Sequence, residues 1–151
     1  MKCTSLLWAL AVAAAAAGCQ PAMDLPAGFV RVDEPGGLHQ MRAVSADGVV
    51  LALRSHDNPR QGTLEFWSEA VKNELVGFRG YKLAGKEAIQ SQAGRPGKLL
   101  SFATEQKGTM FTYMLAVFVP GRQVLIAEAG GKAQAVQPKA EALKKAMLSV
   151  K

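Results

Sequence analysis

Apolar residues recur every three or four positions in two segments of the chain, which is the spacing that places side chains on one face of a helix. The first segment predicts a helix that begins after Thr63, whose hydroxyl can cap it, and ends at Gly77. The second predicts a closing helix with Pro138 in its first turn. The apolar stripes consist of Leu64, Trp67, Val71, Leu75 and Phe78 in the first helix, and of Ala140, Leu143, Met147 and Val150 in the second.

The remaining pattern is that of antiparallel strands separated by short turns. Asp47-Gly48 lies between two strand-like runs, and this pair supplies the positive φ angles of a tight hairpin. Further turns are expected at residues 106–108 and 120–122, and the two glycines at 130–131 are expected to end the last strand. The predicted strands are residues 41–45, 49–55, 98–105, 110–119 and 123–129, with a weaker one within 80–92.

The segment 110–119 carries apolar side chains on both of its faces. Phe111 and Leu115 alternate with Met114 and Phe118. A strand of this kind belongs inside a sheet that is covered on both sides. Together with the order of the elements, this predicts an α+β fold, in which helices flank an antiparallel β-sheet as an α/β/α sandwich.

Four short motifs, in this order of elements, resemble the PsbP-like superfamily, to which the bacterial DcrB-like proteins belong. The motifs are Asp47-Gly48-Val49-Val50, Phe66-Trp67, Gly80-Tyr81 and Glu128-Ala129-Gly130. The resemblance covers residues 28–150 and implies the same α+β sandwich. It also implies a role in binding or stabilising other proteins, without a shared set of catalytic residues.

The first 18 residues differ from all that follow. Lys2 precedes an uncharged apolar stretch from Leu6 to Ala17, which has the length of the central region of a signal peptide and is too short to span a bilayer. The sequence Ala16-Ala17-Gly18-Cys19 resembles the lipobox of bacterial lipoproteins. This resemblance implies cleavage between Gly18 and Cys19, and attachment of diacylglycerol and a further acyl chain to Cys19. The alternatives are an ordinary secretory signal, or a buried cysteine in a cytosolic helix.

The predicted organisation is a signal peptide over residues 1–18, a lipidated tether over 19–28 and a single domain over 29–151. Two prolines and a glycine interrupt any periodicity in the tether. Nine residues reach no more than roughly 30 Å from the lipid headgroups. Gln20 follows the cysteine, and by the sorting rule of enteric bacteria it favours the periplasmic face of the outer membrane.

Composition excludes several classes of protein. The chain has 151 residues, of which 49% are hydrophobic and 20% charged, enough for one folded core. Two cysteines and two histidines cannot form a disulfide framework or a cysteine-rich zinc site, so we expect neither a metal nor a cofactor. The formal net charge is +6, but export removes the protein from nucleic acid, which we do not expect as a partner.

No motif indicates catalysis, and we do not expect an enzyme. The P-loop, the nucleophile elbow and the His-Glu-x-x-His pattern are absent. The densest polar cluster contains His56, Asp57 and Arg60. It could contact a ligand or form a solvated turn.

Two other features are candidates for binding. Phe66 could form an exposed ridge beside Trp67, or pack at the edge of the core. Arg79 and Lys82 open a basic segment that could meet phosphates near a membrane, or simply be solvated. The sequence therefore predicts a lipid-anchored periplasmic module for protein binding or assembly, attached to the membrane through its lipid. The alternative is a carrier or sensor of a small amphiphilic ligand.

Overall fold

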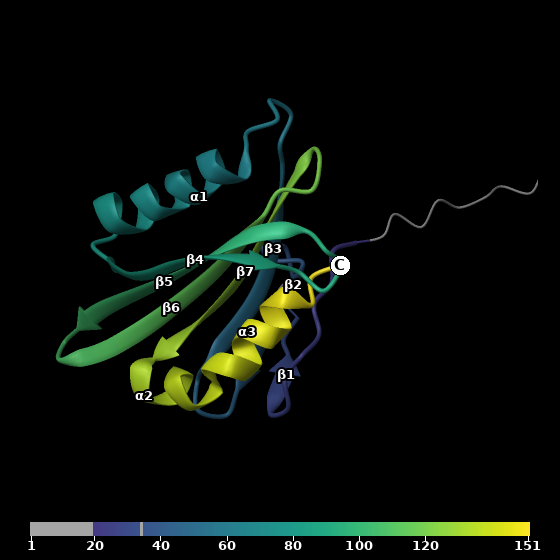
Figure 1. Ribbon diagram of the computed structural model, residues 1–151. Helices are drawn as coiled ribbons and strands as arrows, with labels where there is room; N and C mark the ends of the chain where they lie inside the picture. The colour runs from purple at the N-terminus through teal and green to yellow at the C-terminus, as the bar shows by residue number, and fades with distance from the viewer. Residues whose placement is uncertain (1–19, 34) are drawn as a thin grey trace, which may run out of the picture.

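Seven antiparallel strands form one sheet in the order β1-β2-β3-β7-β6-β5-β4 (Figure 1). The computed structural model describes residues 20–33 and 35–151, so the predicted signal peptide and Cys19 lie outside the described residues. The strands are β1 Phe29–Arg31, β2 Met41–Ser45, β3 Val50–Asp57, β4 Lys82–Gln90, β5 Pro96–Gln106, β6 Thr109–Phe118 and β7 Gln123–Lys132.

Helices cover both faces of this sheet (Figure 1). On one face lies α1 (Leu64–Asn73), which continues into a π-helical turn, η1 (Glu74–Phe78). On the other lie α2 (Ala133–Val136), a 3-10 turn η2 (Gln137–Lys139) and α3 (Ala140–Leu148). Each face has its own hydrophobic cluster. The predicted α+β fold with helices on both sides of an antiparallel sheet is confirmed.

The hairpin turns follow local chemistry. In the β2–β3 turn only Gly48 has a positive φ, 82°, so the expectation of positive φ at both Asp47 and Gly48 is wrong. The Gly48 N–H donates to the Ser45 carbonyl at 3.0 Å, which closes a three-residue loop that needs one left-handed residue. In the β5–β6 turn both Lys107 and Gly108 have positive φ, 50° and 76°, as a two-residue type I′ turn requires.

The helix α1 begins as predicted but ends differently. Thr63 Oγ1 accepts a hydrogen bond from the Phe66 N–H at 3.1 Å, which confirms the cap. The chain does not leave the helix at Gly77. The π-helical turn carries it through Phe78, which is 86% exposed instead of lying on the core stripe, because this wider turn changes the angular spacing of side chains. Gly80, with φ 71°, then reverses the chain.

The two glycines expected to end β7 lie within it, and that prediction is wrong. Gly130 pairs with Tyr113 of β6, and a Cβ atom at Gly130 would stand 2.9 Å from the Tyr113 ring. Glycine is therefore needed here because an aromatic ring lies against the backbone, not because the strand stops.

Part of the predicted tether packs on the domain. Met23 is 6% exposed and belongs to the core beneath α3. The Asp24 N–H donates to Ser149 Oγ at 2.8 Å, and the Lys151 N–H donates to the Ala22 carbonyl at 3.0 Å. The described chain thus joins the domain near residue 22, earlier than the predicted boundary at residue 29. None of the helices in the described ranges is long and apolar enough to cross a membrane.

Candidate functional site

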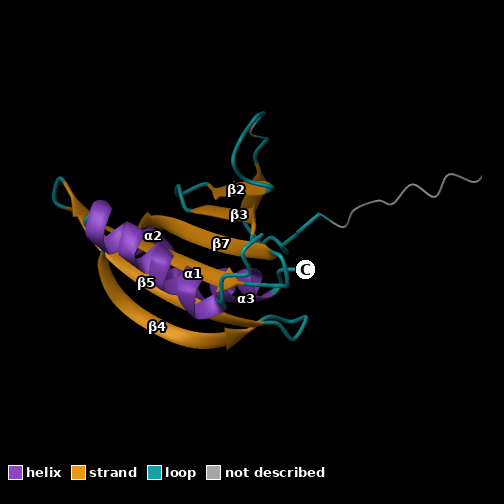
Figure 2. Ribbon diagram, turned by 90° about the horizontal axis from the view of Figure 1, so that it is seen from above, coloured by secondary structure: helices purple, strands orange, loops and turns teal. Residues whose placement is uncertain are grey.

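The helix α1 covers only part of its face of the sheet. It contacts β5 and β6, and Figure 2, which looks onto this face, shows β2 and β3 beside the helix and not beneath it. The strand β6 is accordingly buried on both faces only from Met114 to Phe118, while its first half is mostly half-buried. The prediction that this strand is covered along its whole length is therefore only half correct.

Two adjoining cavities occupy the uncovered area. One, of about 650 Å³, lies beside α1. The other, of about 350 Å³, lies where β6 begins and β7 ends. They share His39, Tyr113 and Glu128. We call the two together the trough. Its lining includes His39, Arg42, Arg54, His56, Trp67, Val71, Leu75, Tyr81, Phe111, Tyr113 and Glu128.

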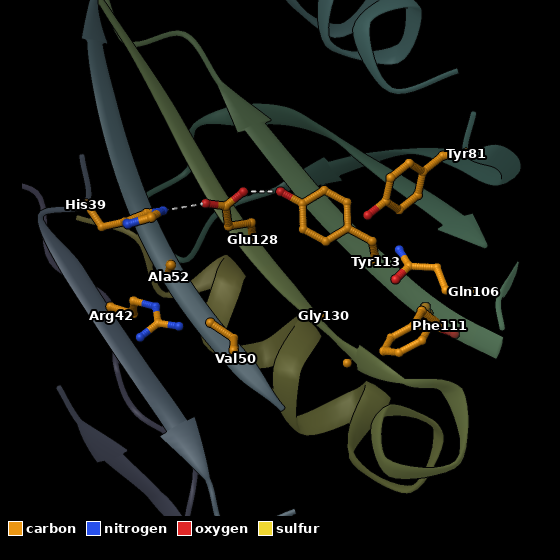
Figure 3. Close-up of a pocket in the computed structure, with 12 residues that line it drawn as sticks. His39, Arg42, Val50, Ala52, Tyr81, Gln106, Phe111, Tyr113, Glu128 and Gly130 are labelled. Atoms are coloured by element: carbon orange, nitrogen blue, oxygen red, sulfur yellow. Dashed lines mark hydrogen bonds and ion pairs between the residues drawn. The ribbon is translucent and has the colours of Figure 1, made fainter. Parts of the chain in front are cut away.

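A row of polar side chains crosses the middle of the trough (Figure 3). At its centre is Glu128 of β7, which is 8% exposed. Arg54 Nη2 donates to Glu128 Oε2 at 3.1 Å, and Arg54 Nε lies 3.1 Å from Oε1. His39 Nε2 lies 3.0 Å from Oε1, and the Tyr113 hydroxyl donates to Oε2. Three side chains therefore hold this one carboxylate.

Tyr113 is fixed as a neutral hydrogen-bond donor. Burial, reinforced by the negative charge of Glu128, raises the pKa of the Tyr113 phenol well above its usual range. The hydroxyl keeps its proton at any physiological pH and goes on donating to Glu128. This pair can orient a bound group, but it offers neither a phenolate nor an unoccupied carboxylate for proton transfer.

The predicted site residues fall into three places. His56 is part of β3, not of a turn, and lines the larger cavity together with Arg79. Asp57, Arg60 and Phe66 instead surround a separate pocket of about 520 Å³ at the start of α1. Lys82 lies at the start of β4, away from both. The structure thus brings together His56 and Arg79, and it does not unite the six residues into one site.

Phe66 is 59% exposed and meets Trp67 edge to face, with ring centroids 5.5 Å apart. Trp67 is half-buried, and its indole N–H donates to the Asn58 side-chain oxygen at 3.2 Å. Trp67 thus packs against the core of this face, as one of the two interpretations expects, but Phe66 is more than half exposed and does not pack at the edge of that core.

Ion pairs balance most of the basic segment. Lys86 Nζ lies 2.6 Å from Glu69 Oε1 and 3.3 Å from Glu65 Oε1. Lys98 also pairs with Glu65. Arg79 Nε lies 3.2 Å from Glu74 Oε1. The pairs of Lys86 and Lys98 link α1 to β4 and β5, and most of the segment is therefore not an open cationic surface.

The sequence analysis missed the central row of the trough. The sequence did contain a signal for it, in the alternation of side chains along the strands. Arg54 and Glu128 are charged residues that each follow a buried apolar residue of a predicted strand. Ala52 pairs with Glu128 and Arg54 pairs with Ile126, a residue of the core beneath α1, so both charges lie on the α1 face of neighbouring strands. In the described ranges, no group of three His, Cys, Asp or Glu side chains could hold a metal ion.

Comparison with known proteins identifies the fold. No family model matches the chain, and no curated protein matches its sequence. The solution structure of cyanobacterial PsbP (CyanoP) from Synechocystis sp. PCC 6803 matches with a TM-score of 0.64 and 13% identity, over 87% of this chain and 91% of CyanoP. LpqN, involved in cell envelope biogenesis of Mycobacterium tuberculosis, matches with a TM-score of 0.66 and 16% identity, over 86% of this chain and 82% of LpqN. The chain therefore has the PsbP-like α+β fold.

Proposed function

We propose that the protein is a non-catalytic binding module of the bacterial envelope, and that it binds another protein in the trough. A lipid on Cys19 anchors it to the periplasmic face of the outer membrane. The lipobox-like sequence before Cys19 supports the anchor, and the role of LpqN in envelope biogenesis supports the compartment.

The trough is the observation that carries this proposal. It is a recessed area of sheet beside α1, with apolar side chains in its floor and charged groups on its rim. His39, Arg54 and Tyr113 all form hydrogen bonds with Glu128, and Tyr113 stays protonated. The polar groups in the middle of the trough are therefore bonded to one another. An arrangement of this kind favours binding over turnover.

Site-specific photocrosslinking in intact cells tests the binding site. A photoreactive amino acid at Leu38, which is 82% exposed on the rim of the trough, should give a discrete protein adduct. The matched control is Gln134 of α2, exposed on the opposite face of the sheet. Equal labelling from both positions, or no adduct from Leu38, contradicts the proposal.

The anchor is tested separately by Cys19→Ser. We expect the substituted protein to lose its lipid and to leave the membrane fraction, because only a thiol forms the thioether. Mass spectrometry of the mature chain measures this directly. A protein that remains acylated and membrane-bound after the substitution contradicts the proposed anchorage.

A carrier of a small amphiphilic ligand is the second candidate. The floor of the trough supports it, because Leu75, Leu115 and Ile126 form an apolar surface below charged side chains. Native mass spectrometry of the protein purified from its own membrane distinguishes the two candidates. A bound small molecule of constant mass supports the carrier, and its absence together with a crosslinked protein supports the binding module.

A further inference from the structure

We infer that the trough recognises an extended segment of its partner in which acidic side chains alternate with apolar ones. This inference rests on the function proposed above, and it adds the chemistry of the partner. It is carried by a difference between the two walls of the trough: the wall formed by β2 and β3 is cationic, and the wall formed by α1 and β6 is apolar and aromatic.

The cationic wall carries the guanidinium groups of Arg42 and Arg54, and His56 lies beside them as a further hydrogen-bonding group. Arg54 and His56 alternate along β3, and Arg42 of β2 pairs with Ala52, the next residue of that alternation. All three line the trough. Among the described residues, the half-buried Arg42 guanidinium has no hydrogen bond or ion pair. Its positive charge is therefore free to bind an anion.

Acidic groups balance only part of this wall. Among the described residues, the acids that line the trough are Glu74 and Glu128. Glu74 pairs with Arg79, and Glu128 is covered and holds Arg54. Arg54 donates to Glu128 through Nη2, and its buried Nε makes no hydrogen bond although it lies 3.1 Å from the same carboxylate; since arginine carries five N–H groups, others remain for a ligand.

The opposite wall is apolar and aromatic. Trp67, Val71 and Leu75 project from α1 and η1, and Phe111 and Tyr113 from β6. Figure 3 shows Arg42 and Phe111 on opposite sides of a floor formed by Val50 and Gly130. At Gly130 the Tyr113 ring lies against the backbone, so an aromatic side chain covers this part of the floor.

The spacing of the cationic wall matches an extended chain. Arg54 and His56 are two residues apart on β3, roughly 7 Å, and Arg42 lies on the neighbouring strand β2 opposite Ala52, which is two residues before Arg54. Side chains on one side of an extended peptide repeat at the same distance. A segment lying along β3 would therefore present every second side chain to the cations and the others to the apolar wall.

The open form of the trough favours a peptide over a small molecule. Pockets for small ligands usually enclose most of the ligand surface. Here the rim remains in solvent: Leu38 is 82% exposed and the Arg79 side chain 63% exposed. An extended segment of a protein needs no such enclosure, because the rest of its chain stays outside.

Two synthetic peptides test the inference. Each has roughly nine residues in extended alternation. One alternates glutamate with leucine and the other lysine with leucine. Fluorescence anisotropy with the full-length protein in detergent should show the glutamate peptide binding at least about ten-fold more tightly, with an affinity that falls as salt is raised. Equal affinities, or a preference for the lysine peptide, overturn the inference.

Charge variants locate the contact. Arg42→Gln should weaken the glutamate peptide by about three- to five-fold, as expected for one partly exposed charge contact. Arg42→Lys should retain most of the binding, since it keeps the charge. The matched control, Lys145→Gln, removes one exposed charge from α3 on the opposite face and should change nothing. Equal effects of Arg42→Gln and Lys145→Gln overturn the inference.

The two proposals can fail separately. A protein adduct at Leu38 combined with no preference for the glutamate peptide leaves the binding module intact and refutes the acidic partner. Tight and charge-dependent peptide binding without an adduct at Leu38 supports the recognition chemistry and contradicts a protein partner at this position in the cell.

Discussion

Replacing Arg54 by leucine removes the cation that Glu128 faces across β3 and β7. Glu128 keeps its contacts with His39 and Tyr113, but its charge, on a side chain only 11% exposed, loses its ion-pair partner. Breaking a fully buried pair costs about 3 to 5 kcal/mol. Because the Arg54 side chain is 27% exposed and two donors remain, we expect Arg54→Leu to lower the free energy of unfolding by about 2 to 3 kcal/mol.

The double variant gives the decisive comparison. Arg54→Leu with Glu128→Leu replaces both charges by apolar groups that can pack on Leu115 and Ile126. Exchanging a whole buried ion pair for apolar side chains is often neutral, but this exchange also leaves the Tyr113 hydroxyl without its acceptor, so we expect the double variant to lose about 1 to 3 kcal/mol, less than the sum of the two single effects. The effects of the two single substitutions would then be strongly non-additive.

Urea unfolding followed by far-ultraviolet circular dichroism measures these differences. Arg60→Leu is the matched control, because Arg60 is exposed, and it should change stability by less than about 0.5 kcal/mol. The reasoning is refuted if Arg54→Leu is as stable as the original protein. It is also refuted if the double variant loses the sum of the two single effects.

Three further predictions concern packing and acid stability, and each is checked by denaturant or thermal unfolding. Gly97→Ala should cost about 3 kcal/mol, since the new Cβ would lie 2.5 Å from the Phe118 ring, whereas Gly85→Ala, with its nearest atom at 3.9 Å, should cost less than about 1 kcal/mol. Met114→Asp should cost several kcal/mol, because Met114 is 8% exposed and packs in the apolar core beneath α3; unchanged stability would refute burial of that face. Hydrogen bonds from Lys72, and then from Lys86, lower the pKa of Glu69 from 4.5 to about 2. The folded state thus binds fewer protons than the unfolded state in this range, and Glu69 contributes stability that is present above pH 4.5 and lost as the pH falls toward 2. Glu69→Gln should lose less stability than the original protein over that interval, and identical pH profiles would contradict this role.

The local parts of the fold could be predicted because their causes lie within a few residues. Thr63 caps α1 through the N–H three residues later, and Lys107-Gly108 forms a type I′ turn. Alternation and helical periodicity identify which side chains face a core. These signals were sufficient for the two-sided sandwich, since a strand apolar on both faces requires cover on both.

The predictions were wrong where contacts between residues far apart in the sequence determine the structure. Gly130 continues β7 because the Tyr113 ring of another strand lies against it, and Met23 is buried because α3 offers it a place in the core. The trough was missed for the same reason, because its central residues come from distant parts of the sequence. Arg54 and Glu128 are 74 residues apart, and only the strand order, with β3 beside β7, brings them together.

The packing of Met23 sets how far from a bilayer the domain could lie under the proposed anchorage through Cys19. If Cys19 carries the lipid, Met23, the first side chain buried in the core, lies only four residues further along the chain. At full extension this stem of chain is roughly 14 Å long. The domain would then lie just above the lipid headgroups. Its carboxyl-terminal end would face the membrane, because the Lys151 N–H donates a hydrogen bond to the Ala22 carbonyl beside the stem. A partner would have to reach the membrane surface itself, and lengthening this stem with a flexible insert should extend the distance at which it can be captured.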